Sequence, residues 1–344
     1  MAGPDALLPA GKLPHHVLRD MLKRYAGGDD PRLLVGPGLG EDAAVIDFGD
    51  TCLVAKTDPI TFATDRIGWY AVHVNANDVA VMGAQPKWFL AVVLLPASSS
   101  TLELARAVMD DISATCDELG VTVCGGHTET TTSVDRPIVV GQMLGEVSPQ
   151  RLVRKERLAV GDDVILTQGA AIEGTAILAR DLRPRLEGRV PNGVLERAGR
   201  LLVDPGISVL PAVRVALGAG DIHAMHDPTE GGVTSGLAEL AAAAGRGLEV
   251  FADRIPVIDE TRIVCGCLNV DPLRLIASGA LLLATPPAET GSVTAALTTA
   301  GIPACVVAVV RPEDEGVVIR DTHGCRPLAP VARDELARIL EDGP

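Results

Sequence analysis

The segment Asn75-Ala76-Asn77-Asp78-Val79-Ala80-Val81-Met82-Gly83-Ala84-Gln85-Pro86 puts a carboxylate inside an apolar helix. The pattern predicts a helix from about Arg66 to Met82, with Asp65 as its N-cap. Residues three or four positions from Asp78 share its face, and they are apolar: Val74, Val81 and Met82. A carboxylate on such a face is costly to bury unless it is paired or binds a metal. We therefore interpret Asp78 as a functional residue.

Two further acidic positions stand where a strand meets a loop. Glu41 and Asp42 lie between the glycine-rich loop Gly36-Pro37-Gly38-Leu39-Gly40 and a predicted strand, residues 43–46. Glycines let backbone N–H groups approach a ligand, and a carboxylate pair beside them suits Mg²⁺, although a turn with solvated acids gives the same pattern. Asp58 follows the predicted strand 52–57, a common ligand position in α/β folds, and an Asp-Pro turn explains it equally well.

Two glycine pairs follow predicted strands. Gly125-Gly126-His127-Thr128-Glu129 comes after residues 121–124, and it is interpreted as a phosphate-binding loop or as a simple turn. His127 is either a metal ligand or phosphate donor, or a structural histidine. In the second half, His226-Asp227-Pro228-Thr229-Glu230-Gly231-Gly232-Val233 ends a strand in an acid and opens a helix with two glycines. Free N–H groups at that positive helix end suit a phosphate or substrate, with a structural cap as the alternative.

The common nucleotide and hydrolase motifs are missing from the sequence. We find no Gly-x-x-x-x-Gly-Lys-Ser/Thr loop, no Gly-x-Ser-x-Gly elbow and no His-Glu-x-x-His. The loop from Gly36 to Gly40 precedes a strand and contains a proline, whereas a dinucleotide fold places its glycines directly after a strand.

The composition restricts the partners and the compartment. The net charge of −15 repels phosphate backbones and anionic lipid, so we expect no nucleic-acid and no membrane binding. No apolar stretch reaches about 18 residues without a charge or breaker, and a signal peptide is not recognised. The seven cysteines are odd in number and mostly lie in apolar runs, which predicts reduced, buried thiols in a cytoplasmic protein.

Strands and helices alternate in two halves of similar size. A charged stretch, residues 151–157, predicts a boundary near residue 155, with domains 1–155 and 156–344. Further strands are expected at 138–144, 164–167, 223–226, 248–251, 280–284 and 305–310. Further helices are expected at 15–26, 100–119 with a capping box, 173–181, 193–202, 233–244, 259–268, 293–300 and 330–340.

Taken in order, these segments resemble the PurM-type, or AIR synthase-related, ATP-binding superfamily. Its members include aminoimidazole ribonucleotide synthetase, the hydrogenase maturation protein HypE, thiamine-phosphate kinase and selenophosphate synthetase. The last third is most similar to HypE through residues 227–232 and Asn269-Val270-Asp271-Pro272-Leu273. The matching segments are Gly40-Glu41-Asp42-Ala43-Ala44-Val45, Thr57-Asp58, Asn77 to Pro86, Gly125 to Thr128, and Asp227 to Gly232.

The resemblance implies a fold, a site and cofactors. The expected fold is α/β (α+β), with an N-terminal domain that forms a β-barrel in a homodimer and a C-terminal α/β domain. The cofactors would be ATP and Mg²⁺, with no catalytic base identified. Metal ligands would be Glu41, Asp42, Asp58 and Asp78. Nucleotide or substrate contacts would come from Gly40, Lys56, Asn77, Gly125, Gly126, His127, Thr128, Asp227, Thr229, Gly231 and Gly232.

Three departures from the family bear on the reaction. HypE carries a C-terminal cysteine that accepts a carbamoyl group, whereas this sequence ends Leu340-Glu341-Asp342-Gly343-Pro344 and its last cysteine is Cys325. His127 stands where HypE and thiamine-phosphate kinase tend to have Asp. The reactive Cys beside a Lys that selenophosphate synthetases place before the first glycine loop is missing.

The predicted function is therefore a HypE-like enzyme that uses ATP to activate an oxygen of a small-molecule substrate or of a group borne by a maturation partner protein. The alternatives are a small-molecule kinase resembling thiamine-phosphate kinase and a non-catalytic nucleotide-binding scaffold in a maturation complex.

Overall fold

A computed structural model describes residues 11–25, 30–61, 65–322, 324–328 and 331–341. These residues form two compact units. The N-terminal unit comprises residues 28–37 and 41–153, and the C-terminal unit comprises residues 1–27, 38–40 and 154–344. The first helix thus groups with the C-terminal unit, and the domain bounds 1–155 and 156–344 stay a prediction.

The N-terminal unit is built on one six-stranded sheet with the order β1-β2-β3-β6-β4-β5. All neighbouring strands are antiparallel except β4 and β5, which run parallel. The strands are β1 (Leu33–Val35), β2 (Ala44–Asp47), β3 (Cys52–Ile60), β4 (Gln85–Pro96), β5 (Thr122–Thr131) and β6 (Ile138–Val147).

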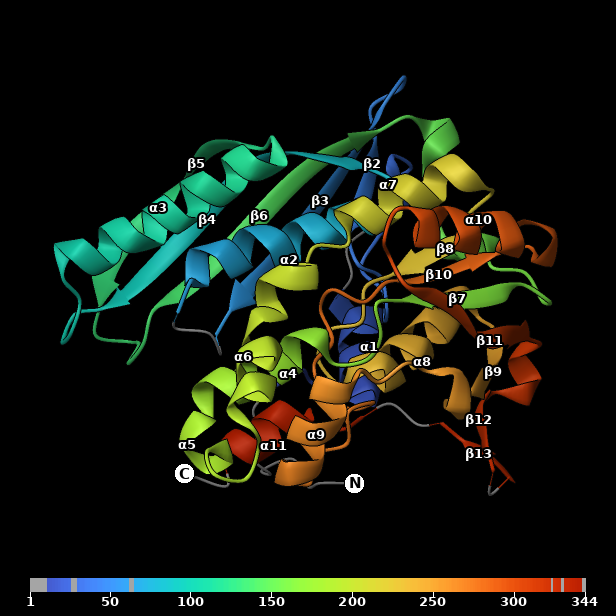
Figure 1. Ribbon diagram of the computed structural model, residues 1–344. Helices are drawn as coiled ribbons and strands as arrows, with labels where there is room; N and C mark the ends of the chain where they lie inside the picture. Colours follow the sequence, from blue (N-terminus) through green and yellow to red (C-terminus); the bar gives the residue numbers. More distant parts are fainter. Residues whose placement is uncertain (1–10, 26–29, 62–64, 323, 329–330, 342–344) are drawn as a thin grey trace. The chain divides into compact units, whose positions relative to one another are not determined.

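Two helices, α2 (Ile67–Val81) and α3 (Leu102–Leu119), lie on one face of this sheet (Figure 1). Nearly every residue of α2 is buried, and the helix packs against β3, β4 and β6 of the sheet and against α3. The prediction of Asp65 as its cap was wrong: the N-cap is Arg66, in a left-handed conformation and without a side-chain cap bond. The capping box predicted from Ser100 to Glu103 is displaced by one residue: the N-cap of α3 is Thr101, whose hydroxyl accepts from the N–H of Leu104, and Gly120 ends the helix as expected.

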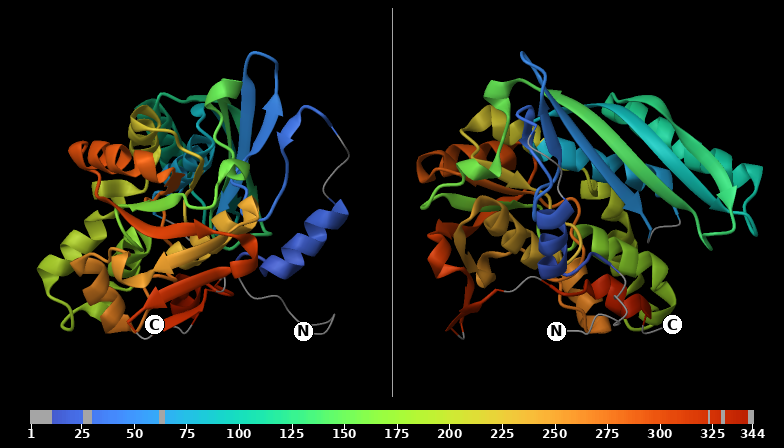
Figure 2. Two further views of the ribbon diagram at one scale, coloured as in Figure 1. Left: turned by 90° about the vertical axis from the view of Figure 1, so that its right-hand side faces the viewer. Right: turned by 180° about the vertical axis from the view of Figure 1, so that it is seen from behind.

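The long strand β4 was not predicted, and it organises the sheet. Phe89, Ala91, Val93 and Leu95 alternate along it and are buried toward the helices. The intervening side chains, among them Val92, face the other side, where no helix of the described N-terminal unit packs (Figure 2, right).

The C-terminal unit has a seven-stranded sheet with the order β13-β12-β9-β11-β7-β10-β8. Adjacent strands in this sheet are antiparallel, except that β12 and β9 run parallel. The strands are β7 (Asp163–Thr167), β8 (Ala224–His226), β9 (Gly247–Phe251), β10 (Leu282–Thr285), β11 (Ala304–Arg311), β12 (Val317–Asp321) and β13 (Gly324–Pro327). The last two strands were not predicted.

The helices of this unit enclose two apolar cores. One core joins the sheet to α8 through residues such as Leu237 and Leu282, and the other joins α4, α6 and α9 through residues such as Leu178 and Val264. The helices are α1 (His15–Tyr25), α4 (Ile172–Asp181), α5 (Arg183–Leu186), α6 (Asn192–Arg200), α7 (Leu210–Ala219), α8 (Gly232–Ala244), α9 (Asp259–Leu268), α10 (Pro287–Thr299) and α11 (Glu335–Glu341). Short helical turns cover Pro149–Arg151, Lys155–Arg157, Leu202–Gly206, Ala252–Arg254 and Glu313–Glu315.

Most predicted elements are present with shifted ends. Helix α10 begins at Pro287, six residues before the predicted start, because proline is well tolerated in a first helical turn. Helix α7 was missed, and α11 begins at Glu335, whereas the predicted start at residue 330 lies outside the described residues.

The cysteines occupy both buried and exposed positions. Cys52, Cys116 and Cys265 are buried as expected, whereas Cys124 and Cys325 are exposed. Cys325 lies in β13, opposite Arg320 of β12. Among the described residues, no single helix has the length and apolarity to cross a membrane, although one pair bent by 47°, residues 192–206 and 210–219, has them jointly.

Candidate functional site

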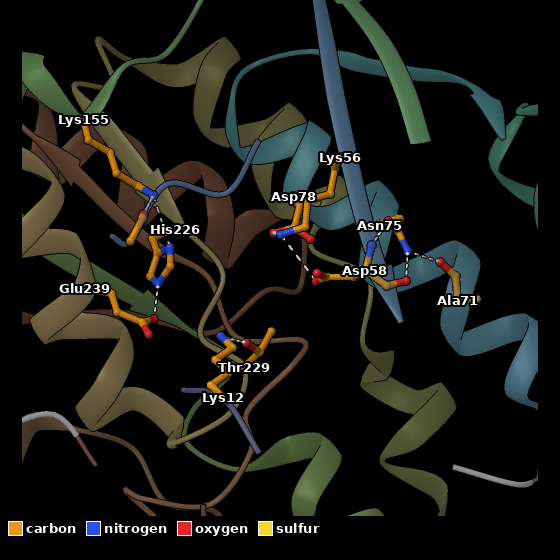
Figure 3. A network of polar contacts seen from close by, with 11 residues as sticks. Lys12, Lys56, Asp58, Ala71, Asn75, Asp78, Lys155, His226, Thr229 and Glu239 are labelled. Atoms are coloured by element: carbon orange, nitrogen blue, oxygen red, sulfur yellow. Dashed lines mark hydrogen bonds and ion pairs between the residues drawn. The ribbon is translucent and has the colours of Figure 1, made fainter. Parts of the chain in front are cut away.

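An acidic group lies between β3 and α2 in the N-terminal unit (Figure 3). Lys56 and Asp58 are two residues apart on β3 and therefore point to the same face of the sheet. The ammonium of Lys56 lies 3.4 Å from Oδ2 of Asp58 and 3.3 Å from Oδ1 of Asp78. Asp58 was predicted to follow its strand, but β3 continues through it to Ile60.

Asp78 is the most deeply buried member of this group, with 5% of its surface exposed. Burial raises the pKa of its carboxyl to about 7; the Lys56 ammonium opposes this, and the carboxylates of Asp58 and Asp42 add to it. Its Oδ2 atom has no hydrogen-bond partner among the described residues. A buried carboxyl in this state has one oxygen free to take a cation or a proton.

Asn75 holds Asp58 in place, a role the sequence interpretation did not assign. Its side-chain oxygen accepts from the N–H of Asp58 at 2.9 Å, and its amide nitrogen donates to the carbonyls of Asp58 at 3.3 Å and Ala71 at 2.9 Å. Strand β2 pairs with β3 only as far as Ala55, so Asn75 supplies the backbone partner beyond that point. The signal in the sequence was its position three residues before Asp78, on the same helix face.

Three other predicted residues of this unit, Glu41, Asp42 and Asn77, differ in how they relate to Asp78. Asp42 is buried and close enough to Asp78 to raise its pKa, whereas Glu41 is half-buried. Asn77 is fully buried within α2. The structure therefore brings Asp42, Lys56, Asp58 and Asp78 into one electrostatic group.

The predicted phosphate-binding loop at Gly125 to Glu129 is not a loop. These residues lie in the middle of β5, the edge strand, and their side chains are exposed. Parallel pairing with β4 continues to Thr131, which keeps the segment extended. A Cβ on Gly126 would lie 2.1 Å from the carbonyl oxygen of Ala91, so its glycine is needed for close strand packing.

His127 and Thr128 therefore lie on an exposed strand. The Nε2 atom of His127 lies 3.1 Å from Oε2 of Glu129, two residues away on the same face. Their predicted contacts to phosphate remain predictions.

Gly40 belongs to the C-terminal unit and packs against the backbone of α8. Its φ is +80°, and a Cβ there would lie 2.4 Å from the carbonyl oxygen of Glu239. The buried ammonium of Lys155 donates to the carbonyl oxygen of Gly40. Close packing thus requires a glycine here, whatever ligand the loop also contacts.

A chain of buried polar side chains runs behind this loop (Figure 3). The Lys155 ammonium lies 3.4 Å from Nδ1 of His226, and Nε2 of His226 lies 3.1 Å from Oε2 of Glu239. His15 of α1 reaches the other oxygen of Glu239 at 3.3 Å. Burial alone would raise the pKa of Glu239, but hydrogen bonds from His15 and His226 hold it well below its usual range. The sequence interpretation missed Lys155 and Glu239, which stand 84 positions apart.

The segment Asp227 to Gly232 connects β8 to α8. Asp227 is buried, and Thr229 accepts a hydrogen bond from the Lys12 ammonium at 3.2 Å. The N–H of Gly231 donates to Oδ2 of Asp334 at 2.6 Å, and the N–H of Gly232 donates to the carbonyl of Thr229 at 3.0 Å. The helix end predicted to bind phosphate is thus satisfied by the chain itself in this structure, and its ligand contacts remain a prediction.

Comparison with known proteins gives this arrangement a family context. Residues 40–147 match the AIR synthase related protein, N-terminal domain, and residues 159–321 match the corresponding C-terminal domain. A hydrogenase expression/formation protein HupE of Azotobacter chroococcum is 30% identical over 73% of this chain and 72% of its own length. A carbamoyl dehydratase HypE of Rhodobacter capsulatus is 29% identical over 91% of this chain and 90% of its own length.

The fold agrees with these matches. The crystal structure of E. coli HypE, a hydrogenase maturation protein, superposes with a TM-score of 0.71 at 25% identity, covering 94% of this chain and 98% of that one. The two sheets and the matched ranges together show that the chain belongs to the AIR synthase-related protein family, with HypE among its relatives.

Proposed function

We propose that the protein is a HypE-like enzyme that binds ATP with Mg²⁺ and activates an oxygen of a small-molecule or partner-borne substrate by phosphoryl transfer. The observation that carries the proposal is the buried carboxyl of Asp78, grouped with Asp42, Asp58 and Lys56. A structural role alone does not account for a fully buried acid with an unpartnered oxygen.

The residues present fit magnesium. Asp42, Asp58 and Asp78 offer carboxylate oxygens, the ligands that Mg²⁺ prefers, with Glu41 next in the chain. Oδ2 of Asp78 has no hydrogen-bond partner among the described residues and can accept a metal ion. The contact of the Lys56 ammonium with Oδ1 of Asp78 shows that the carboxyl attracts positive charge. When bound, Mg²⁺ would neutralise the phosphate oxygens of ATP.

The chain's own groups prepare this site before any ligand arrives. Asn75 fixes the backbone of Asp58, and Lys56 balances part of the negative charge. Such positioning is what phosphoryl transfer asks of a protein, because the transition state needs alignment and charge neutralisation more than covalent help.

Asp78→Asn tests the proposal by calorimetry. The change replaces the carboxylate that would bind the metal by a neutral amide of nearly the same shape, so the affinity for Mg-ATP should fall by at least about tenfold. Asp135→Asn is the matched control, because the Asp135 side chain is 89% exposed on the β5–β6 turn, and its affinity should stay unchanged. Equal affinity in wild type and Asp78→Asn would show that Asp78 is structural and that the metal assignment is wrong.

Product analysis separates the three functions that share this site. ADP release identifies an enzyme and excludes the scaffold. A phosphorylated product would identify a kinase, whereas free phosphate with a dehydrated product would identify the HypE-like reaction.

The homodimer is part of the proposal. The sheet face opposite α2 carries the apolar side chains Leu90, Val92 and Leu94, and Val92 is 37% exposed. Beside them, β5 is an exposed edge strand. A second copy that paired with this surface would cover both.

Light scattering tests the dimer. The wild type should have twice the chain mass of 35.7 kDa, and Val92→Lys should shift it toward the monomer. Val203→Lys, at an exposed valine of the C-terminal unit, should leave the dimer intact. A monomeric wild type would contradict the assignment.

A further inference from the structure

The first turn of α4 holds a buried carboxyl that the proposed nucleotide chemistry does not use. Glu173 is 4% exposed, and Ser278 donates hydrogen bonds to its side chain. The Oε2 atom of Glu173 has no hydrogen-bond partner among the described residues. Burial raises the pKa of this carboxyl to about 7 against the Ser278 hydrogen bonds, and the charges of Asp334 and Glu230 raise it further.

The backbone that presents Glu173 is strained. Gln168 and Ala171 have φ values of 61° and 58°, and Gly169 between them has a φ of 126°. Left-handed non-glycine residues cost roughly 1 kcal/mol each, and such strain gathers at functional sites. Hydrogen bonds from Ala170 to Pro256 and from Gly174 to Ile276 hold the turn in this form.

A second buried carboxyl, Asp334, reaches the same place from near the other end of the chain. Its Oδ2 accepts the N–H of Gly231 at 2.6 Å, and its Oδ1 accepts the N–H of Leu336 at 2.7 Å. Burial raises the pKa of Asp334 to about 6 despite these bonds, and Glu230 raises it further.

Glu230 completes the group. Its Oε2 accepts the backbone N–H of Lys12 at 3.1 Å, and the Lys12 ammonium donates to Thr229 at 3.2 Å. Three carboxyl groups of the C-terminal unit therefore gather around the Gly231 turn.

We propose that Glu173, Glu230 and Asp334 form a binding subsite for a cationic nitrogen group, an ammonium or a guanidinium, carried by a ligand. Such a group supplies the N–H donor that Oε2 of Glu173 lacks among the described residues, together with a positive charge that three neighbouring carboxyls attract. A neutral amide would satisfy the hydrogen bond only. The subsite lies within the C-terminal unit, and none of its three carboxyls is among the predicted nucleotide contacts or metal ligands.

The subsite carries a pH signature. Besides burial, the groups that act most on the pKa of Glu173 are Ser278, Asp334 and Glu230. A bound cation favours the ionised carboxyl, so binding should strengthen as the pH rises through about 7 and should lower the midpoint at which Glu173 titrates.

The test follows the Glu173 carboxyl by ¹³C NMR, with its signal identified by its loss in Glu173→Gln. The probe is methylguanidinium chloride, and sodium chloride at the same ionic strength is the reference. Methylguanidinium should lower the Glu173 midpoint by about one pH unit or more. Half-saturation should require about tenfold more probe in Glu173→Gln, followed by protein amide shifts.

Glu315→Gln is the control variant, because Glu315 is an exposed glutamate of the same unit. It should bind methylguanidinium as the wild type does. An unmoved Glu173 midpoint would overturn the proposal and leave the cluster as a proton-sharing structural group. A midpoint that moves with magnesium chloride and not with methylguanidinium would overturn it in favour of a metal site.

Discussion

Asn75→Ala should destabilise the N-terminal unit strongly, although Asn75 lies in no predicted ligand set. The side chain is fully buried and makes three hydrogen bonds to backbone groups, two of them to Asp58. Removing it leaves the N–H and carbonyl of Asp58 unsatisfied at about 1–3 kcal/mol each, with a small cavity in addition. We therefore expect a loss of about 3–5 kcal/mol in unfolding free energy, measured by urea denaturation.

A double-mutant cycle with Gly141 sharpens this prediction. A Cβ on Gly141 would lie 2.4 Å from the Asn75 amide nitrogen and 2.9 Å from the Phe89 ring. Gly141→Ala should therefore cost stability in the wild type and clearly less in the Asn75→Ala background, because the closest contact has gone. Additive costs in the cycle, or a loss below about 1 kcal/mol for Asn75→Ala, would refute the proposed packing and hydrogen bonding.

Two further predictions concern a glycine and a titration. Gly40→Ala should lower the free energy of unfolding by about 3 kcal/mol or more, measured by thermal unfolding, because its Cβ would meet Glu239. Gly49→Ala is the control: Gly49 has a similar φ of +87° and no atom within 4 Å of an added Cβ, so it should cost only the roughly 1 kcal/mol of the left-handed backbone. Equal costs would show that the contact with Glu239 is unimportant. Because the pKa of Asp78 is raised to about 7, its contribution to native stability is complete below its unfolded pKa and is lost as the pH rises to about 7. Asp78→Asn should avoid this loss, which amounts to up to about 4 kcal/mol in the free energy of unfolding, so the ligand-free variant should melt at a higher temperature than the wild type at pH 8. A lower melting temperature of the variant at pH 8 would contradict the burial of this charge.

The sequence predicted the features that depend on local pattern. The conflict between Asp78 and its apolar neighbours could be read from helical spacing, and the structure confirms that Asp78 is buried. Helix α3 was found for the same reason, since its cap and its terminal glycine lie next to it in the chain.

Features that depend on distant partners were missed or misassigned. Gly125 and Gly126 looked like a turn because the strand that keeps them extended, β4, lies about 35 residues earlier. The grouping of Glu173 with Asp334 joins positions 161 residues apart, and no spacing rule connects them. The prediction of Asp65 as the N-cap of α2 was wrong because the N-cap is Arg66, and the residue types around Asp65 do not indicate the left-handed conformation of Arg66.

The position of Lys56 has a consequence for how the protein should be handled. An ammonium that contacts both Asp58 and Asp78 acts as a built-in counter-ion, which a divalent ion must push aside in order to bind. Folding therefore does not require bound metal. Chelator treatment should leave the protein folded, and the metal-free protein should be suitable for titration with magnesium. The same lysine makes magnesium affinity a competition between two cations of one site, so substitution of Lys56 by a neutral residue should trade stability of the empty protein for tighter metal binding.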